Sequence, residues 1–298
     1  MSIVITAPNG NVGAPLVEAL LEAGVQPVLI ARNPEKIQRF VDHGATVRRG
    51  SHADADFLVE ATRGAEALFV LTPNHFQVRD IREHYATFAR AAVAAVQANG
   101  IQRVVHLSSV GAELEAGNGP VTGLNAAEAV LDAGGTPHLI HLRPAYFMEN
   151  TMMQIPSILQ AGRLFTPFGP GTSFPMIATR DIGRRAAELL LDRSWTGHRI
   201  VELLGAGEYS YEEVAATLST VLERELTHVT VPPAALEQSI LAMGGSAVLA
   251  AAFVELTEGL AAGLVTNHEP RSEANTTPTT YALFAEQVFK PAIVAAAG

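Results

Sequence analysis

The chain has no cysteine among its 298 residues, which excludes disulfide bonds, thiolate nucleophiles and cysteine-ligated zinc. Its 10 histidines show neither H-x-H nor H-x-x-x-H spacing, so the sequence predicts no metal site. Lysine is scarce, since Lys36 and Lys290 are the only two, and the formal net charge is -10. Because a nucleic-acid surface needs clustered cations, we expect no nucleic-acid partner and instead a small-molecule ligand.

Long apolar runs are missing as well. The most apolar stretch, residues 241–254, is shorter than the roughly 20 residues of a membrane-spanning helix, and we expect one buried, alanine-rich helix there. The first residues, MSIVITAPNG, lack the basic region and apolar run of a secretory signal. We therefore expect no membrane partner and a cytoplasmic location. The oligomeric state is expected to be a monomer or a homodimer.

What is present is an alternation of short β-rich runs with helical patterns, which predicts an α/β fold with a doubly wound parallel (Rossmann) sheet. Strands are expected at residues 2–6, 26–31, 46–49, 67–71, 103–108, 138–142 and 199–204. Helices are expected at 14–23, 34–43, 81–99, 124–133, 180–191, 211–223, 234–243 and 281–289. We assign 1–150 to a dinucleotide-binding Rossmann domain that also receives 181–205. Residues 151–180 and 206–298 are assigned to a smaller C-terminal substrate lobe, with 162–175 forming a loop over the site.

The first predicted strand runs into Ala7-Pro8-Asn9-Gly10-Asn11-Val12-Gly13 and then a helix. A side chain at Gly10 would keep the backbone away from a diphosphate, and Gly13 lets the helix pack closely on the strand. Free N–H groups at the helix start then attract the phosphates. An ordinary strand-to-helix turn is the alternative. We predict that this loop contacts a dinucleotide cofactor through Thr6, Asn9, Gly10, Asn11, Val12 and Gly13.

The second predicted strand ends at Arg32, where an acidic residue would hold the ribose hydroxyls of NAD. A guanidinium at this position suits a 2′-phosphate, and Lys36 follows one helical turn later. The sequence therefore favours NADP(H) and keeps NAD(H) as the alternative. A solvated surface arginine is the other interpretation of Arg32.

Several segments together resemble the NmrA-like, or atypical short-chain dehydrogenase/reductase, family. They are residues 6–13, 31–36, 71–73, 106–112, 142–150, 180–182 and 278–281. The resemblance implies cofactor contacts from Thr72 and Pro73 near the ribose, and from Ser108, Tyr146 and Phe147 around the nicotinamide. It also implies a substrate cleft between the Rossmann half and the C-terminal lobe.

The chain departs from the wider family at the Tyr-x-x-x-Lys pair, in which lysine lowers the tyrosine pKa for proton transfer. Counting from the serine pair puts these positions near Val121 and Asn125, or the lysine position at Leu124, and none of them is Tyr or Lys. This argues against carbonyl reduction by the usual relay. The remaining enzyme hypothesis is an NAD(P)H-dependent oxidoreductase acting on a quinone-like or polycyclic aromatic substrate.

That hypothesis follows the family's quinone reductases, triphenylmethane-dye reductases and members that modify aromatic polyketides in antibiotic biosynthesis. The alternative is a regulatory protein of NmrA type that senses the NADP/NAD balance and binds a protein partner without catalysis. Both readings need the cofactor loop. Only the first needs a working substrate pocket.

Candidate catalytic residues are His75, which follows the fourth predicted strand, and Asn125, which could orient a carbonyl. A solvated surface position is the alternative for each. Asp181 is expected to cap a helix. An apolar lid over a flat substrate is expected from Phe165, Phe168 and Phe174, with local packing under a loop as the alternative. The substrate residues proposed from the sequence are His75, Phe76, Ser109, Val110, Asn125, Met148, Asn150 and Phe168.

Overall fold

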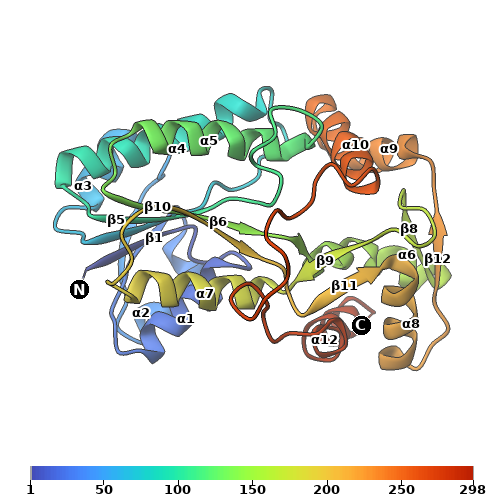
Figure 1. Cartoon of the computed structure of the whole chain (residues 1–298). Helices are drawn as coiled ribbons and strands as arrows, with labels where there is room; N and C mark the ends of the chain where they lie inside the picture. The colour runs from blue at the N-terminus through green and yellow to red at the C-terminus, as the bar shows by residue number, and fades with distance from the viewer. Residues whose placement is uncertain (1, 298) are drawn as a thin grey trace.

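The computed structural model describes residues 2–297, and its largest element is a seven-stranded parallel sheet in the order β10-β6-β5-β4-β1-β2-β3 (Figure 1). The strands are β1 Ile3–Thr6, β2 Val28–Ala31, β3 Thr46–Arg49, β4 Ala67–Val70, β5 Arg103–Leu107, β6 His138–Pro144 and β10 Gly197–Leu203. Most are short apolar runs, because a parallel sheet is covered by helices on both faces. The predicted α/β fold class is confirmed.

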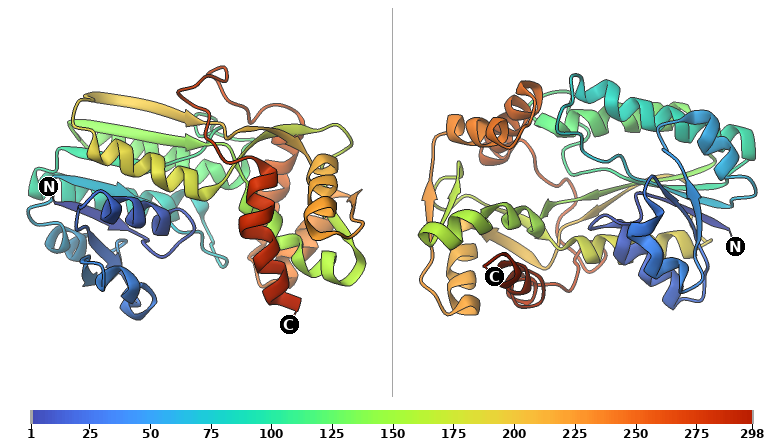
Figure 2. Two further views of the ribbon diagram at one scale, coloured as in Figure 1. Left: turned by 90° about the horizontal axis from the view of Figure 1, so that it is seen from below. Right: turned by 180° about the vertical axis from the view of Figure 1, so that it is seen from behind.

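Alternate residues of these strands feed two separate cores. Ile3 and Ile5 pack towards α1 and α7, whereas Val4 packs on the opposite side towards α4. Figures 1 and 2 show the resulting layers, with α1, α2 and α7 on one face and α3, α4 and α5 on the other. These helices are α1 Gly13–Glu22, α2 Gln38–Val41 after a 3-10 turn at Pro34–Ile37, α3 Ala55–Ala61, α4 Ile81–Asn99, α5 Thr122–Ala133 after a 3-10 turn at Gly119–Val121, and α7 Thr179–Leu191.

The carboxyl ends of β5, β6 and β10 face a second group of elements with a core of its own, which we call the small lobe. It contains a three-stranded sheet, β11-β9-β7, and a parallel pair, β8 with β12. Its strands are β7 Tyr146–Phe147, β8 Arg163–Thr166, β9 Ser173–Ile177, β11 Gly207–Ser210 and β12 Thr227–Thr230. Its helices are the 3-10 segment Met148–Gln154, α6 Ile155–Ala161, α8 Tyr211–Leu222, α11 Tyr281–Phe284, a π-helical segment Ala285–Phe289 and α12 Lys290–Ala297.

Besides the connections to α9 and from α10, the chain crosses between the large sheet and the small lobe at three neighbouring places: after β6, after β9 and after β10. The connections after β6 and after β10 are joined by a hydrogen bond from Ala145 N to Leu203 O of 2.8 Å. The connection after β9 touches the one after β10, because a Cβ atom on Gly205 would lie 1.8 Å from Met176 O. The three connections are therefore packed against one another.

Helices α9 (Pro233–Ala242) and α10 (Ala247–Ala261) pack on the Rossmann half, where Ile240, Leu249 and Ala252 share the core of α4 and α5. The single buried helix expected over 241–254 is wrong. Gly244 adopts φ +85° in a turn that separates α9 from α10, and Leu241 and Val248 are each 43% exposed. Within residues 2–297, no helix is both long enough and apolar enough to cross a membrane.

The loop expected over 162–175 contains β8 and the start of β9 instead. Alternation of buried and exposed side chains in Arg163–Thr166 was the available signal, since Leu164 and Thr166 face the core. Strands β7, β11 and β12 and helix α3 were not expected either. The proposed domain division stays a prediction, and its outermost residues, 1 and 298, lie outside the described range.

Candidate cofactor and active site

The loop between β1 and α1 leaves three backbone donors free. Within residues 2–297, the N–H groups of Asn11, Val12 and Gly13 make no hydrogen bond, and no side chain caps α1. Ala7 occupies the first small-residue position with φ 50°, a left-handed conformation that an L-residue adopts at some cost. Helix α1 starts so close to it that a Cβ atom on Gly13 would lie 2.1 Å from Ala7 O. The loop is therefore a tight turn whose donors are available to an anion.

The side chains of Thr6 and Val12 face the protein interior. The Thr6 hydroxyl donates to Phe69 O at 3.1 Å and accepts from Leu71 N at 2.9 Å, which ties β1 to the end of β4. Val12 is buried in the core between the sheet and α1. Asn9 and Asn11 are exposed beside Gly10. Contacts of Thr6 and Val12 with a ligand would therefore come from backbone atoms.

The segment after β4 presents a hydroxyl that has no partner. Thr72 is 8% exposed, and its Oγ1 atom makes no hydrogen bond with the described residues. The carbonyl groups on either side of it are held by imidazoles, since His52 Nε2 lies 3.0 Å from Leu71 O and His84 Nε2 lies 2.9 Å from Pro73 O. Burial lowers the pKa of His52 to about 4, so this ring is neutral at neutral pH. Because buried polar groups usually have a hydrogen-bond partner, this hydroxyl is available to a ligand at the strand end.

Arg32 and Lys36 are both exposed, at the end of β2 and in the 3-10 turn that follows it. Neither forms an ion pair with any residue in the described part of the chain. The charge of Arg32 also acts on nearby His52, whose pKa it helps to lower after the larger effect of burial. Both cations are therefore available to an anionic ligand at the carboxyl end of β2.

A buried charged cluster behind Ser108 was missed by the sequence reasoning. The Ser108 hydroxyl donates to Glu128 Oε1 at 2.5 Å, and Arg143 binds both oxygens of Glu128, through Nε at 3.0 Å and Nη2 at 2.6 Å. The remaining nitrogen of Arg143, Nη1, donates to Glu113 at 2.7 Å. Burial alone would lower the pKa of Arg143, but the bonds and charges of these carboxylates raise it above its usual value. The available signal was an arginine inside β6, a strand that is buried along most of its length.

Tyr146 lies where the chain enters the small lobe, with its hydroxyl 3.2 Å from that of Tyr211. Burial raises the pKa of Tyr146 despite opposing hydrogen bonds with Tyr211 and Asn150, so the phenol is neutral at neutral pH. Phe147 and Asn150 are half-buried nearby, whereas Met148 is wholly buried in the small-lobe core.

The three phenylalanines expected to form a lid are placed differently. Phe168 is 2% exposed and stacks on Tyr211 with ring centroids 5.7 Å apart, and Phe174 is buried beside it. Only Phe165 lies at the surface. Because β8 and β9 fold back on α8, these rings fill the small-lobe core rather than a movable lid.

His75 and Asn125 are not brought together within the described chain. His75 is exposed and its ring lies 5.7 Å from that of His84, while neighbouring Phe76 is half exposed. The Asn125 amide donates to Ala112 O at 2.9 Å and accepts from Arg82 at 3.1 Å.

Two other predicted site residues, Ser109 and Val110, follow β5: the Ser109 hydroxyl donates to Val110 O, and Val110 is buried.

The cap expected at Asp181 is wrong, because Ala178 holds the N-cap position of α7. The Asp181 carboxylate instead accepts two hydrogen bonds from Thr279, of 3.0 and 2.8 Å. It therefore fastens the C-terminal segment to α7.

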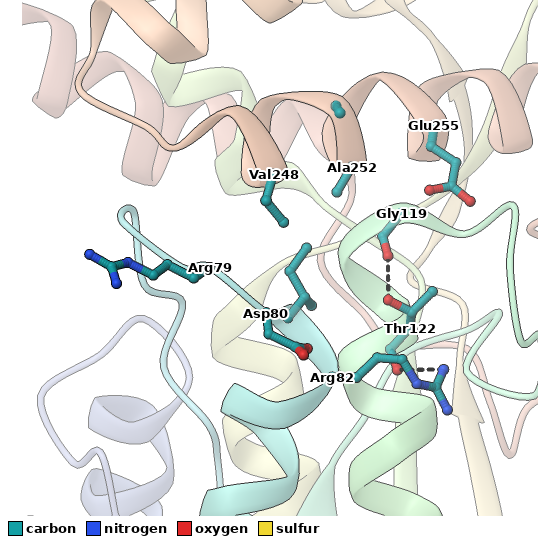
Figure 3. Close-up of a pocket in the computed structure, with 10 residues that line it drawn as sticks. Arg79, Asp80, Arg82, Gly119, Thr122, Val248, Ala252 and Glu255 are labelled. Atoms are coloured by element: carbon teal, nitrogen blue, oxygen red, sulfur yellow. Dashed lines mark hydrogen bonds between the residues drawn. The ribbon is translucent and has the colours of Figure 1, made fainter.

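Helix α10 roofs a cavity of about 410 Å³ at the starts of α4 and α5 (Figure 3). In this view Asp80 and Arg82 from the start of α4 and Thr122 from α5 lie below Val248 and Ala252 of α10. The α9–α10 turn is also tied to the segment after Thr72, since Ser246 N donates to Phe76 O and Ser246 Oγ to Val78 O, at 2.8 and 2.6 Å. The start of α10 is thus attached to the segment that follows Thr72.

Comparison with known proteins agrees with this geometry. The model of the NmrA-like family matches residues 1–264. A (4-alkanoyl-5-oxo-2,5-dihydrofuran-3-yl)methyl phosphate reductase of Streptomyces griseus is 30% identical over 229 residues, which cover 75% of each chain. An NADPH-dependent quinone oxidoreductase of Escherichia coli, solved with NADPH, superposes with a TM-score of 0.81 at 23% identity, over 96% of this chain and 99% of that one.

A triphenylmethane reductase of Citrobacter sp., solved with NADP(H), superposes with a TM-score of 0.76 at 19% identity, over 96% of this chain and 99% of that one. These relatives and neighbours are oxidoreductases, and the free amide donors fit a nicotinamide dinucleotide. The chain therefore belongs to the NmrA-like family, within a group of NAD(P)H-dependent oxidoreductases.

Proposed function

We propose that the protein is an NADP(H)-dependent reductase of a conjugated acceptor, quinone-like or polycyclic aromatic. The observation that carries the proposal is the set of free N–H groups at Asn11, Val12 and Gly13, at the same sheet edge as the unpartnered Thr72 hydroxyl. Open α/β sheets bind ligands at the carboxyl ends of their strands, and amide donors at a helix start suit a diphosphate. Asn9, Gly10 and Pro73 complete this proposed cofactor site, and Phe147 flanks its nicotinamide end.

The choice of acceptor rests on the missing proton relay. Val121 and Asn125 occupy the two positions of the usual pair, and neither side chain is an acid. A bound nicotinamide would supply the hydride. A conjugated acceptor spreads the incoming charge over its rings and needs little help from a strong acid, so positioning contributes much of the rate. The names of the quinone and dye reductases among the structural neighbours support this class.

Arg32→Ala should weaken NADPH binding by about 10- to 100-fold, because a charge-assisted hydrogen bond to phosphate contributes about 1.5–3 kcal/mol. NADH, which lacks the 2′-phosphate, should bind about as before. Titration of both cofactors by fluorescence measures the two dissociation constants. Arg63→Ala, at an exposed arginine paired with Glu60, removes the same charge and should change neither. Equal losses for both cofactors with Arg32→Ala would return NAD(H) to consideration.

We also propose His75 as the proton donor and Asn125 as a group that orients the acceptor. General acids contribute about 10²-fold or more, so His75→Ala should lower turnover by about that factor and leave the NADPH dissociation constant unchanged. Asn125→Ala should lower turnover by a smaller factor. His43→Ala, at an exposed histidine after α2, is the matched control. Unchanged turnover with His75→Ala would mean that solvent supplies the proton.

The proposal as a whole is tested by two measurements. A ligand present at about 100 times its dissociation constant stabilises the folded state by about 2.7 kcal/mol, so NADPH should raise the melting temperature. NADPH oxidation should then be followed with benzoquinone, naphthoquinone and triphenylmethane dyes. Cofactor binding without turnover, together with capture of a protein at a fixed NADP/NAD ratio, would instead indicate the cofactor-sensing regulator. A cytoplasmic location, a monomeric or homodimeric state and a role in antibiotic biosynthesis also stay proposals.

A further inference from the structure

The hydroxyl of Ser108 is held by charged residues that the proposed reaction does not yet use. Ser108 is 3% exposed at the carboxyl end of β5, and its backbone N–H donates to Leu142 O at 2.8 Å. The strand register that pairs Val70 with His106 brings Thr72 beside Ser108, so the two hydroxyls lie on neighbouring strand ends. The Thr72 hydroxyl has no partner among residues 2–297, and the Ser108 hydroxyl is bonded to Glu128.

The cluster fixes the direction of the Ser108 hydrogen bond. Arg143 contacts both oxygens of Glu128, and an ionised carboxylate paired in this way has no proton to give. Arg143 cannot turn away, because Glu113 holds its third nitrogen and in turn lies 2.8 Å from His268 Nε2. The only proton on the Ser108 oxygen is therefore donated to Glu128. The Ser108 oxygen can therefore only accept a hydrogen bond from a ligand, through its lone pairs.

We propose that Glu128 and Arg143 hold Ser108 as a hydrogen-bond acceptor, which receives an N–H of the nicotinamide carboxamide and does not polarise a substrate carbonyl. This inference rests on the proposed function. A serine whose proton is free would donate to a carbonyl oxygen and so favour ketone reduction. Ser108 has no proton for that purpose, which agrees with an acceptor whose charge is delocalised. Glu128 and Arg143 are positioning residues, because they act through Ser108.

The test compares NADPH with reduced 3-acetylpyridine adenine dinucleotide phosphate, in which a methyl group replaces the amide nitrogen. The wild-type protein should bind NADPH about tenfold more tightly, the effect of about one hydrogen bond. Ser108→Ala should bring the ratio of the two dissociation constants close to one. Ser108→Thr keeps a hydroxyl and should restore the preference. Ser157 on α6 donates its hydroxyl to Gln154 O, and the control variant Ser157→Ala should keep the wild-type ratio of the two dissociation constants.

Glu128→Gln and Glu128→Leu together test the positioning role. Because Arg143 Nε also donates to Glu128 Oε1, the glutamine should keep its amide oxygen towards Ser108 and Arg143, so the preference for NADPH should persist. Glu128→Leu, in contrast, removes the acceptor, frees the serine proton and should remove the preference. A general loosening of the fold would weaken both cofactors equally and leave the ratio unchanged. If Glu128→Leu does not fold, the two Ser108 variants still decide the inference.

Equal binding of both cofactors to the wild-type protein would overturn the inference, as would a preference that survives in Ser108→Ala. Failure to bind either cofactor would instead contradict the proposed function. The two failures are therefore distinguishable from the same titrations.

Discussion

Replacing Gly13 by alanine should abolish dinucleotide binding and lower the free energy of unfolding by several kcal/mol. The added methyl group would lie 2.1 Å from Ala7 O and 3.0 Å from Pro8 Cα, and both neighbours are backbone atoms that cannot rotate away. Helix α1 would have to move off the loop, and overpacking of this kind costs about 1–3 kcal/mol or more. Urea unfolding measures the stability, and fluorescence titration with NADPH measures the binding.

Gly10→Ala separates binding from folding. A Cβ atom at Gly10 would meet only Ala7 O, at 3.7 Å, which is an ordinary contact, so the stability should change by less than about 0.5 kcal/mol. The same methyl group would stand where a diphosphate approaches the backbone. We expect NADPH affinity to fall by about 10- to 100-fold, the loss of one or two hydrogen bonds to phosphate. A Gly10→Ala protein that binds NADPH normally would place the cofactor elsewhere.

Arg143→Met should destabilise the protein by about 3–5 kcal/mol, the usual result of removing one partner of a buried ion pair. The variant leaves the carboxylate of Glu128 buried without its guanidinium and also takes the guanidinium partner from Glu113. Equilibrium unfolding in urea measures the loss. The matched control is Arg185→Met on α7, which removes an exposed pair with Glu188 and should cost less than about 1 kcal/mol.

The double variant Arg143→Met with Glu128→Leu should recover part of this stability, because an apolar pair needs no charge compensation. Recovery would show that the loss comes from an uncompensated charge and not from lost packing. A single Arg143→Met variant within about 1 kcal/mol of the wild type would mean that the cluster is dispensable for folding.

The sequence was sufficient to predict the Rossmann half because its signals are local. Val4 and Ile30 belong to short apolar runs, Gly13 opens the first helix, and Gly100 ends α4 in the left-handed conformation that favours glycine. Each of these signals can be read within a few residues. The strands and helices predicted for the first half of the chain are therefore present in the predicted order, although helix α3, between β3 and β4, was not expected.

The charged cluster could not be predicted in the same way. Glu128 looks like the polar side of α5, and its pairing with Arg143 depends on how α5 packs over β6, which is a tertiary contact. The burial of Phe168 and Phe174 in the small-lobe core could not be predicted for a related reason. Phe174 belongs to β9 and Phe168 lies between β8 and β9. Aromatic residues in a segment rich in glycine and proline look like part of a loop until such strands have found their partners. The proposed roles of His75 and Asn125 stay predictions for experiment.

The three packed crossings between the large sheet and the small lobe have a mechanical consequence. A body joined by one linker can swing about it, but rotation about any of these connections is opposed by the two others, which touch it through Gly205 and Ala145. The spacing between Ser108 and Tyr146 is then set during folding and needs no closure when a ligand arrives. Preorganisation of this kind reduces the entropy lost on binding.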